Sequence, residues 1–143
     1  MIVREILDTK GRNVTTITPD KTLSEAAQLL AERKIGALVV TGAKRRVTGI
    51  LSERDIVKAV SKDGATALHA TVDSVMTREV VICGTSDTMA ELMGQMTARR
   101  IRHMPVIEND RLAGIISIGD VVKHRLAEIE RESSALRSYI MTA

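Results

Sequence analysis

The sequence predicts a mixed α/β (α+β) fold in which one β-α-β-β-α unit occurs twice in tandem. The pattern Thr-x-x-Glu at residues 22–25 returns 66 residues later at 88–91. The pattern Gly-Ile-x-Ser-x-x-Asp at residues 49–55 returns 65 residues later at 114–120. Thr-x-x-Glu ahead of an apolar-periodic stretch is typical of a helix start. Because order, spacing and residue type all agree, we interpret the chain as a duplication.

Each unit contains the same kinds of segment in the same order. A short β-rich run precedes a helix with apolar residues at positions i, i+3, i+4 and i+7. Two strands joined by a tight polar loop follow, and a second helix begins near Ser52 or Ser117. We expect strands at 14–17, 37–40 and 47–51 with a helix from 23, and strands at 80–83, 104–107 and 112–116 with a helix from 89.

Packing arguments then set the domain organisation. A three-stranded sheet with both helices on one face is a poor core alone, so the two units should pack sheet to sheet with pseudo-two-fold symmetry. We assign repeat 1 to residues 1–62, a surface linker to 63–71, repeat 2 to 72–127 and a C-terminal helical extension to 128–143. After Asp120, residues spaced alternately by four and three form a narrow helical seam. They are Val122, Leu126, Ile129, Ser133, Leu136 and Ile140.

Composition narrows the classes of partner. Tyr139 is the single aromatic residue among 143, so bases could not be stacked as in most readers of single-stranded nucleic acid. The net charge is +3 and the basic clusters are short, which argues against a nucleic-acid patch. The lone Cys83 lies in an apolar run, which indicates a buried, inert thiol. With no membrane-length apolar segment and no secretory pattern, we expect a cytoplasmic protein that does not contact membranes.

The residues of common enzyme motifs are missing. Neither a dinucleotide-binding Gly-x-Gly-x-x-Gly nor a phosphate-binding P-loop pattern occurs. His69, His103 and His124 are scattered without metal-ligand spacing, so no metal site is expected. No nucleophile, base and orienting group can be assembled from the spacing. We therefore predict that the chain is not an enzyme and carries no catalytic cofactor.

Two motifs carry a family resemblance. The Gly-containing pattern at 49–56 and again at 114–121, together with Ile-Arg-His-Met-Pro-Val at 101–106, resembles the CBS domain. The tandem is similar to a CBS pair, or Bateman module, of the stand-alone bacterial kind. The resemblance implies a regulatory module that senses energy or redox state. Its ligand would be AMP, ADP, ATP, NAD or S-adenosylmethionine, bound in clefts between the copies.

The paired serines and aspartates are the first candidate ligand residues. A carboxylate in the first turn of a helix can accept two hydrogen bonds from the vicinal hydroxyls of a ribose. The resemblance implies this role for Asp55 and Asp120, and places Ser52 and Ser117 near ribose or phosphate. A helix N-terminus is also hospitable to oxyanions. The alternative is structural, because Ser-x-x-Asp can also cap a helix without any ligand.

Basic and apolar residues complete the candidate site. Arg102 and His103 would contact phosphate, because arginine offers several donors and histidine titrates near neutral pH. The alternative is a surface charge and a packed side chain. Arg54 would add positive potential, or be a solvated helix charge. The remaining candidates would surround the adenine, with plain core packing as the alternative. They are Thr16, Thr18, Ile35, Gly36, Ala37, Cys83, Ile101, Met104 and Pro105.

Assembly and site symmetry follow from the same features. Exposed apolar surface predicts a homodimer, with the helices after Ser52 and Ser117 at its interface. The seam after Asp120 would join that interface or fold back on its own module. Gly36 and Ala37 correspond to Arg102 and His103, so the two nucleotide sites should differ. A ligand-free dimerisation scaffold and a nucleic-acid binder are the alternatives, and a downstream protein partner is expected but not identified.

Overall fold

The first repeat forms the predicted three-stranded sheet. The computed structural model describes residues 1–142. Strand β2 lies between β1, which is parallel to it, and β3, which is antiparallel. All five residues of β2 are buried, as expected for a central strand covered on both faces. The elements are β1 (Thr16–Ile17), α2 (Leu23–Arg33), β2 (Ala37–Thr41), β3 (Val47–Ser52) and α3 (Glu53–Asp63).

The second repeat has a smaller sheet than the sequence predicted. Its elements are α5 (Met89–Arg99), β4 (His103–Glu108), β5 (Arg111–Ser117) and α6 (Ile118–Thr142). The strand expected at 80–83 is wrong, since only Cys83 pairs, through one parallel bridge to Val106. The physical reason is that this segment spans both repeats. Thr77 exchanges backbone hydrogen bonds with Ile50 of β3 in repeat 1, and Cys83, six residues later, pairs in repeat 2. The residues between them must cross from one repeat to the other and cannot pair along β4.

The predicted helix starts are confirmed at both copies of Thr-x-x-Glu. The Thr22 hydroxyl accepts a hydrogen bond from the Glu25 backbone N–H at 3.2 Å. The Thr88 hydroxyl accepts one from the Glu91 N–H at 3.1 Å. Each bond satisfies a backbone donor that the first helical turn would otherwise leave without a partner.

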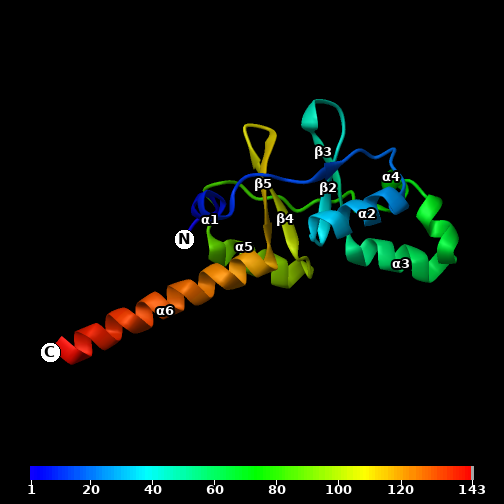
Figure 1. Cartoon of the computed structure of the whole chain (residues 1–143). Helices are drawn as coiled ribbons and strands as arrows, with labels where there is room; N and C mark the ends of the chain where they lie inside the picture. The colour runs from blue at the N-terminus through cyan, green and yellow to red at the C-terminus, as the bar shows by residue number, and fades with distance from the viewer. Residues whose placement is uncertain (143) are drawn as a thin grey trace.

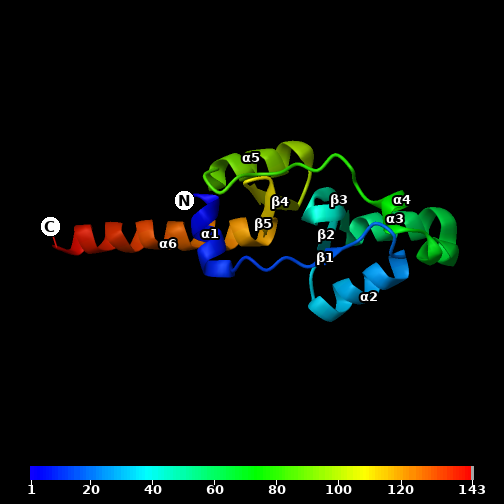
Figure 2. The same ribbon diagram turned by 90° about the horizontal axis from the view of Figure 1, so that it is seen from above.

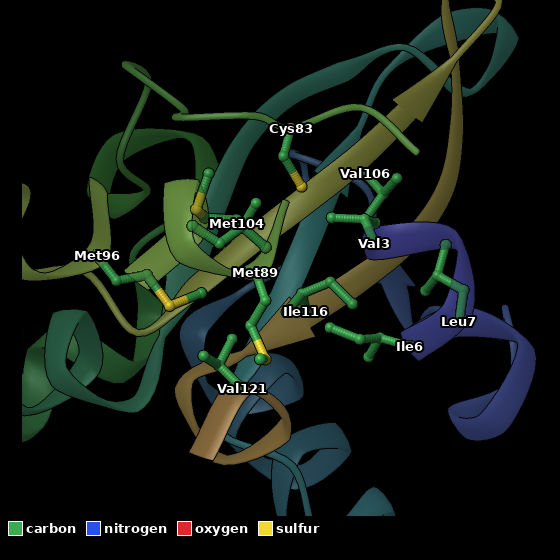
Figure 3. Packing of buried hydrophobic residues seen from close by; sticks show 11 residues of the cluster. Val3, Ile6, Leu7, Cys83, Met89, Met96, Met104, Val106, Ile116 and Val121 are labelled. Atoms are coloured by element: carbon green, nitrogen blue, oxygen red, sulfur yellow. The ribbon is translucent and has the colours of Figure 1, made fainter. Parts of the chain in front are cut away.

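Two short helices that the sequence analysis did not predict exchange places between the repeats. Helix α1 (Val3–Lys10) precedes repeat 1 but buries Val3, Ile6 and Leu7 in the core of repeat 2, where they meet β4, β5 and α5 (Figure 3). Helix α4 (Val72–Val75) precedes repeat 2 but buries Val72 and the following Met76 in the core of repeat 1. Each repeat is therefore completed by the helix that leads into the other.

Backbone pairing fixes the same exchange. Ile2 forms an antiparallel bridge with Thr88, and Thr22 forms one with Thr71. The Val3 N–H donates to the Asp87 carbonyl at 2.9 Å. In both repeats the incoming segment pairs with residues directly ahead of the first long helix. The two repeats are consequently interlocked, and we expect them to fold as one unit.

The segment between the repeats is more ordered than a surface connection. Residues assigned to the linker form a 3-10 helix, η2 (Gly64–His69), that packs on α3 and α2. Ala67 is buried there. Small residues are typical of a solvated loop, but a methyl group is also what fits beneath a closely packed turn.

The arrangement in space confirms the predicted fold class. The β2–β3 and β4–β5 hairpins lie side by side with their loops pointing the same way (Figures 1 and 2). The predicted C-terminal helix is confirmed as α6, a 25-residue helix that projects from the body as a rod (Figure 1). Ala143, included in the predicted extension, lies outside the described residues. No helix in residues 1–142 is long and apolar enough to cross a membrane, and the cytoplasmic location stays a prediction.

Both glycines of the repeated motif lie against the exchanged helices. A Cβ on Gly49 would lie 2.5 Å from Met76 Sδ, and one on Gly114 would lie 2.6 Å from Leu7 Cδ2. These distances are shorter than any carbon–carbon or carbon–sulfur packing contact. A side chain at either position would therefore force the exchanged Leu7 or Met76 to shift.

We expect Gly114→Ala to lower the free energy of unfolding by about 1–3 kcal/mol, the usual cost of overpacking a core. Urea denaturation followed by circular dichroism measures the change. Gly94→Ala is the matched control, because Gly94 lies in α5 with open space around it. That change should stabilise by about 0.5–1 kcal/mol, because alanine favours helix over glycine. Equal effects of the two changes would show that Leu7 does not pack tightly on Gly114.

Candidate functional site

A cleft of about 580 Å³ opens between the two repeats. This volume is within the range of pockets that hold small molecules. The start of α3, the residues ahead of β4, and the strap of chain at 77–81 form its walls. Seven of the sequence-predicted site residues lie along it. They are Gly36, Ser52, Arg54, Asp55, Ile101, Arg102 and His103.

The Ser52–Asp55 pair forms a complete capping box at the cleft. The Asp55 N–H donates to Ser52 Oγ at 3.3 Å, and Asp55 Oδ2 accepts the Ser52 N–H at 2.9 Å. The Ser52 hydroxyl also donates to Oδ2, at 3.1 Å. Asp55 is only half-buried, and within residues 1–142 its Oδ1 accepts no hydrogen bond. The pair therefore does cap α3, and Oδ1 of Asp55 stays available in the cleft.

The charges along the cleft are mixed. Four cationic side chains line it, namely Arg54, Lys58, Arg100 and Arg102. Three carboxylates also line it, namely Glu53, Asp55 and Glu79. Apolar side chains of both repeats, among them Ile50, Val80 and Ile101, lie between the charges. The cleft therefore offers donors for an anion, acceptors for hydroxyl groups and an apolar surface for a flat ring.

His103 stands where the two repeats meet. Its imidazole faces Gly36, where an added Cβ would lie 3.5 Å from Cε1. Burial lowers the pKa of His103, and the nearby Lys10 and Arg102 cations lower it further, against the opposing Asp120 and Glu53 carboxylates. The ring is consequently neutral at pH 7, and one ring nitrogen carries a proton that it can donate.

The second Ser–Asp pair lies outside this cleft. The Ser117 and Asp120 backbone and side chains repeat the capping bonds, at 2.8 and 3.1 Å. The Lys10 ammonium, at the end of α1, forms an ion pair with Asp120 and donates to the Ile115 carbonyl at 2.7 Å. Burial opposes ionisation of Asp120, but the hydrogen bonds from Lys10 and from Ser117 outweigh it and hold the Asp120 pKa below its usual range.

The exchanged segments make the two pairs unlike. Leu7 packs on Gly114 as Met76 packs on Gly49, so three residues further on Lys10 corresponds to Glu79. A cation therefore neutralises Asp120, whereas a carboxylate lines the cleft that contains Asp55. Two equivalent motifs in the sequence therefore have charges of opposite sign at one corresponding position, Lys10 and Glu79.

The structure places the other sequence-predicted residues elsewhere. Thr16 and Thr18 line a separate surface hollow beside α2. Ile35 lines another hollow, between α2 and α3. The side chains of Ala37, Met104, Pro105 and Cys83 are buried in the protein interior.

Sequence reasoning missed the strap at 77–81 and the role of Lys10. Thr77, Glu79, Val80 and Val81 all line the cleft. The sequence pattern placed residues 80 and 81 in a strand of repeat 2, because their β-rich composition suits a strand as well as an extended strap. One signal was available in the sequence. Val3 and Val72 correspond at an offset of 69 residues, so the segment that precedes repeat 1 is itself repeated ahead of repeat 2.

A duplicated α/β unit with a ligand-sized cleft between the copies defines a paired-repeat module. A family model described as CBS domain matches residues 3–62 and again residues 72–127. The chain belongs to the CBS domain family and has the tandem form of a CBS pair, a class of regulatory modules. Within residues 1–142, no group of three or more His, Cys, Asp or Glu side chains is arranged to hold a metal ion.

Known proteins share both the sequence pattern and the fold. The mitochondrial CBS domain-containing protein CBSX3 of Arabidopsis thaliana is 32% identical over 146 residues, which cover 96% of this chain and 71% of that protein. The crystal structure of the CBS-domain containing protein ATU1752 from Agrobacterium tumefaciens is 54% identical with a TM-score of 0.86, covering 87% of this chain and 99% of that one.

A more distant structure contains bound ligands. The CBS domain pair of protein MJ0100, in complex with 5-methylthioadenosine and S-adenosyl-L-methionine, has a TM-score of 0.80 and 22% identity. The match covers 90% of this chain and 98% of that one. At this identity the comparison shows a shared fold.

We expect Cys83 to resist thiol reagents while the protein is folded. Burial, with a smaller contribution from the Asp87 carboxylate, raises the pKa of the Cys83 thiol to about 12, so almost no thiolate is present at pH 8. Reaction with a chromogenic disulfide reagent should be slow in buffer and fast in guanidinium chloride. Ser138→Cys, which adds an exposed thiol on α6, is the control and should react fast in buffer. Rapid reaction of native Cys83 would contradict its placement in the core.

Proposed function

We propose that the chain is a regulatory module that binds an adenine nucleotide of the AMP, ATP or NAD type in the cleft between its repeats. The observation that carries the proposal is the position of Asp55. Its carboxylate lies at a helix start, in a ligand-sized cleft, opposite cationic side chains of the other repeat. Ribose hydroxyls need an acceptor and phosphates need donors, and this cleft offers both.

Each part of the nucleotide has a candidate partner. The ribose hydroxyls would donate to the Asp55 carboxylate at Oδ1, which is available, because Oδ2 already accepts the two capping bonds from Ser52. The phosphate would take Arg102 and the neutral His103 as donors, with Arg54 adding positive potential. The adenine would rest on the apolar side chains of the strap and of Ile101.

The bound state of a related fold supports this choice of ligand. The MJ0100 pair, which shares the fold, holds two adenosine derivatives, 5-methylthioadenosine and S-adenosyl-L-methionine. Both contain a ribose joined to adenine, and neither contains phosphate. The four cations along the present cleft favour a ligand with phosphate groups over those two.

We expect AMP, ATP or NAD to raise the melting temperature of the protein. A ligand at a hundred times its dissociation constant should stabilise by about 2.7 kcal/mol. In Asp55→Asn the amide oxygen can still cap α3, but the charge-assisted bonds to ribose are lost, so affinity should fall about 10- to 100-fold. Calorimetric titration of wild type and variant, with GTP and S-adenosylmethionine as comparison ligands, measures the change.

Controls separate binding from stability and from catalysis. Asp63→Asn, an exposed change at the end of α3, should bind as wild type does. Chromatography after incubation should recover the nucleotide unchanged, as expected of a sensor and not of an enzyme. If no nucleotide shifts the melting temperature at millimolar concentration, the ligand-free scaffold becomes the better account. Tight, steeply salt-dependent RNA or duplex binding would favour a nucleic-acid module.

We further propose that the two Ser–Asp pairs are not equivalent binding sites. The Lys10 ion pair already satisfies Asp120 in the absence of ligand. A ribose would have to displace that ammonium, whereas Asp55 is free to accept. The inequivalence expected from Gly36 and Arg102 is thus supported by a second difference, which comes from the exchanged helix.

We expect wild type to bind one nucleotide per chain and Lys10→Met to bind two. Methionine keeps most of the apolar stem of lysine but releases the Asp120 carboxylate. The stoichiometry from calorimetric titration is the measurement. Lys21→Met, which removes an exposed ion pair with Glu25, is the control and should leave one site. Two equal sites in wild type would contradict the proposal that Lys10 prevents binding at Asp120.

A further inference from the structure

The seam along α6 is apolar and exposed over the whole length of the rod. Val122, Leu126, Ile129, Leu136 and Ile140 each keep between 45% and 63% of their surface in contact with solvent. The opposite side of the first turns holds the helix to the body, through the buried Val121 and through an ion pair of 3.6 Å between the Met1 ammonium and Glu128. The seam therefore faces away from its own module.

The spacing of the seam is that of a coiled coil. Residues 122, 126, 129, 133, 136 and 140 alternate by four and three, an average of 3.5 residues per turn. In heptad terms, Leu126, Ser133 and Ile140 occupy the a positions, and Val122, Ile129 and Leu136 the d positions. A helix that packs on a single globular core shows a wider apolar face than this.

Charges beside the seam show which partner fits. The charged residues at the g positions are Arg125 and Glu132, and those at the e positions five residues later are Glu130 and Arg137. In a parallel pair of helices each g residue meets the e residue of the next heptad on the partner. Arg125 would meet Glu130 of a second copy, and Glu132 would meet Arg137. Both pairs across the interface would join opposite charges.

The antiparallel alternative brings like charges together. When the seam overlaps fully in that orientation, e residues face e residues and g residues face g residues. Glu130 would then face Glu130, Glu132 would face Glu132, and Lys123 would face Arg137. Like charges at such positions are destabilising.

Arg125 already forms an ion pair with Glu128 at 3.1 Å within the helix, whereas the other three charges have no such partner along it. Glu130, Glu132 and Arg137 each lack an oppositely charged residue three or four positions away, where an ion pair along a helix would form. Figure 1 shows the C-terminal part of α6 extending beyond the body, so a neighbouring element does not supply their partners.

We propose that α6 pairs in parallel and in register with α6 of a second copy of this chain, as a short coiled coil of about three heptads. The coil places the two modules on opposite sides of their shared axis, because the body lies on a different side of α6 from the seam. This proposal does not depend on the proposed nucleotide site.

Charge reversal tests the orientation on the full chain. Arg137→Glu would bring a carboxylate against that of Glu132 twice in the dimer, so the dissociation constant from sedimentation equilibrium should rise about fivefold or more. The double variant Glu132→Arg with Arg137→Glu should return to within about twofold of wild type, because opposite charges meet again. Failure of the double variant to recover, or a monomeric wild type at all concentrations, would overturn the proposal.

Disulfide trapping tests the register. Ser133→Cys lies at a central a position, where equivalent residues of a parallel pair face each other, so mild oxidation should give a covalent dimer in high yield. Ser138→Cys, at an f position on the outer face, is the matched control and should stay unlinked. Native Cys83 is buried and does not compete. Equal cross-linking of both variants, or none at Ser133→Cys, would contradict an in-register parallel pair.

Discussion

The packing of Leu7 on Gly114 and of Met76 on Gly49 is the contact on which the rest of this structure depends. Each is made by a segment, α1 or α4 with the following Met76, that leads into one repeat and completes the core of the other. A single repeat, with its small sheet and two helices, leaves an apolar face that it cannot cover. The exchange covers both faces at once, which explains why neither repeat would be expected to fold alone.

The same exchange creates the cleft. To bring Met76 to repeat 1 and Cys83 to repeat 2, the chain between them must cross the boundary as an extended strap. That strap forms one wall of the cleft, and α3 with the approach to β4 forms the others. Candidate binding residues from two repeats thus converge because of a packing requirement. The segment that corresponds to the strap, residues 8–12, contains the cation Lys10 where the strap has the carboxylate Glu79.

Local patterns in the sequence predicted more of the fold than of the candidate site. Thr22 and Thr88 predicted their helices correctly because a cap acts within one turn. The motif containing Ser52 and Asp55 was identified for the same reason, and its capping bonds are present. Lys10 was missed because it meets Asp120 across 110 residues, through a tertiary contact that no periodicity encodes. Thr16 and Thr18 were placed by their position in the repeat, but in the fold they line a different hollow, beside α2.

Helix α6 is also a lever. Its 25 residues extend about 37 Å at 1.5 Å per residue, with the first turn held against repeat 2. A rotation of about 10° at that base would carry the far end through roughly 6 Å, on the same rise per residue. A rearrangement around Lys10 and Asp120 too small to disturb the core would therefore be enlarged at the tip into a displacement as large as a helix radius.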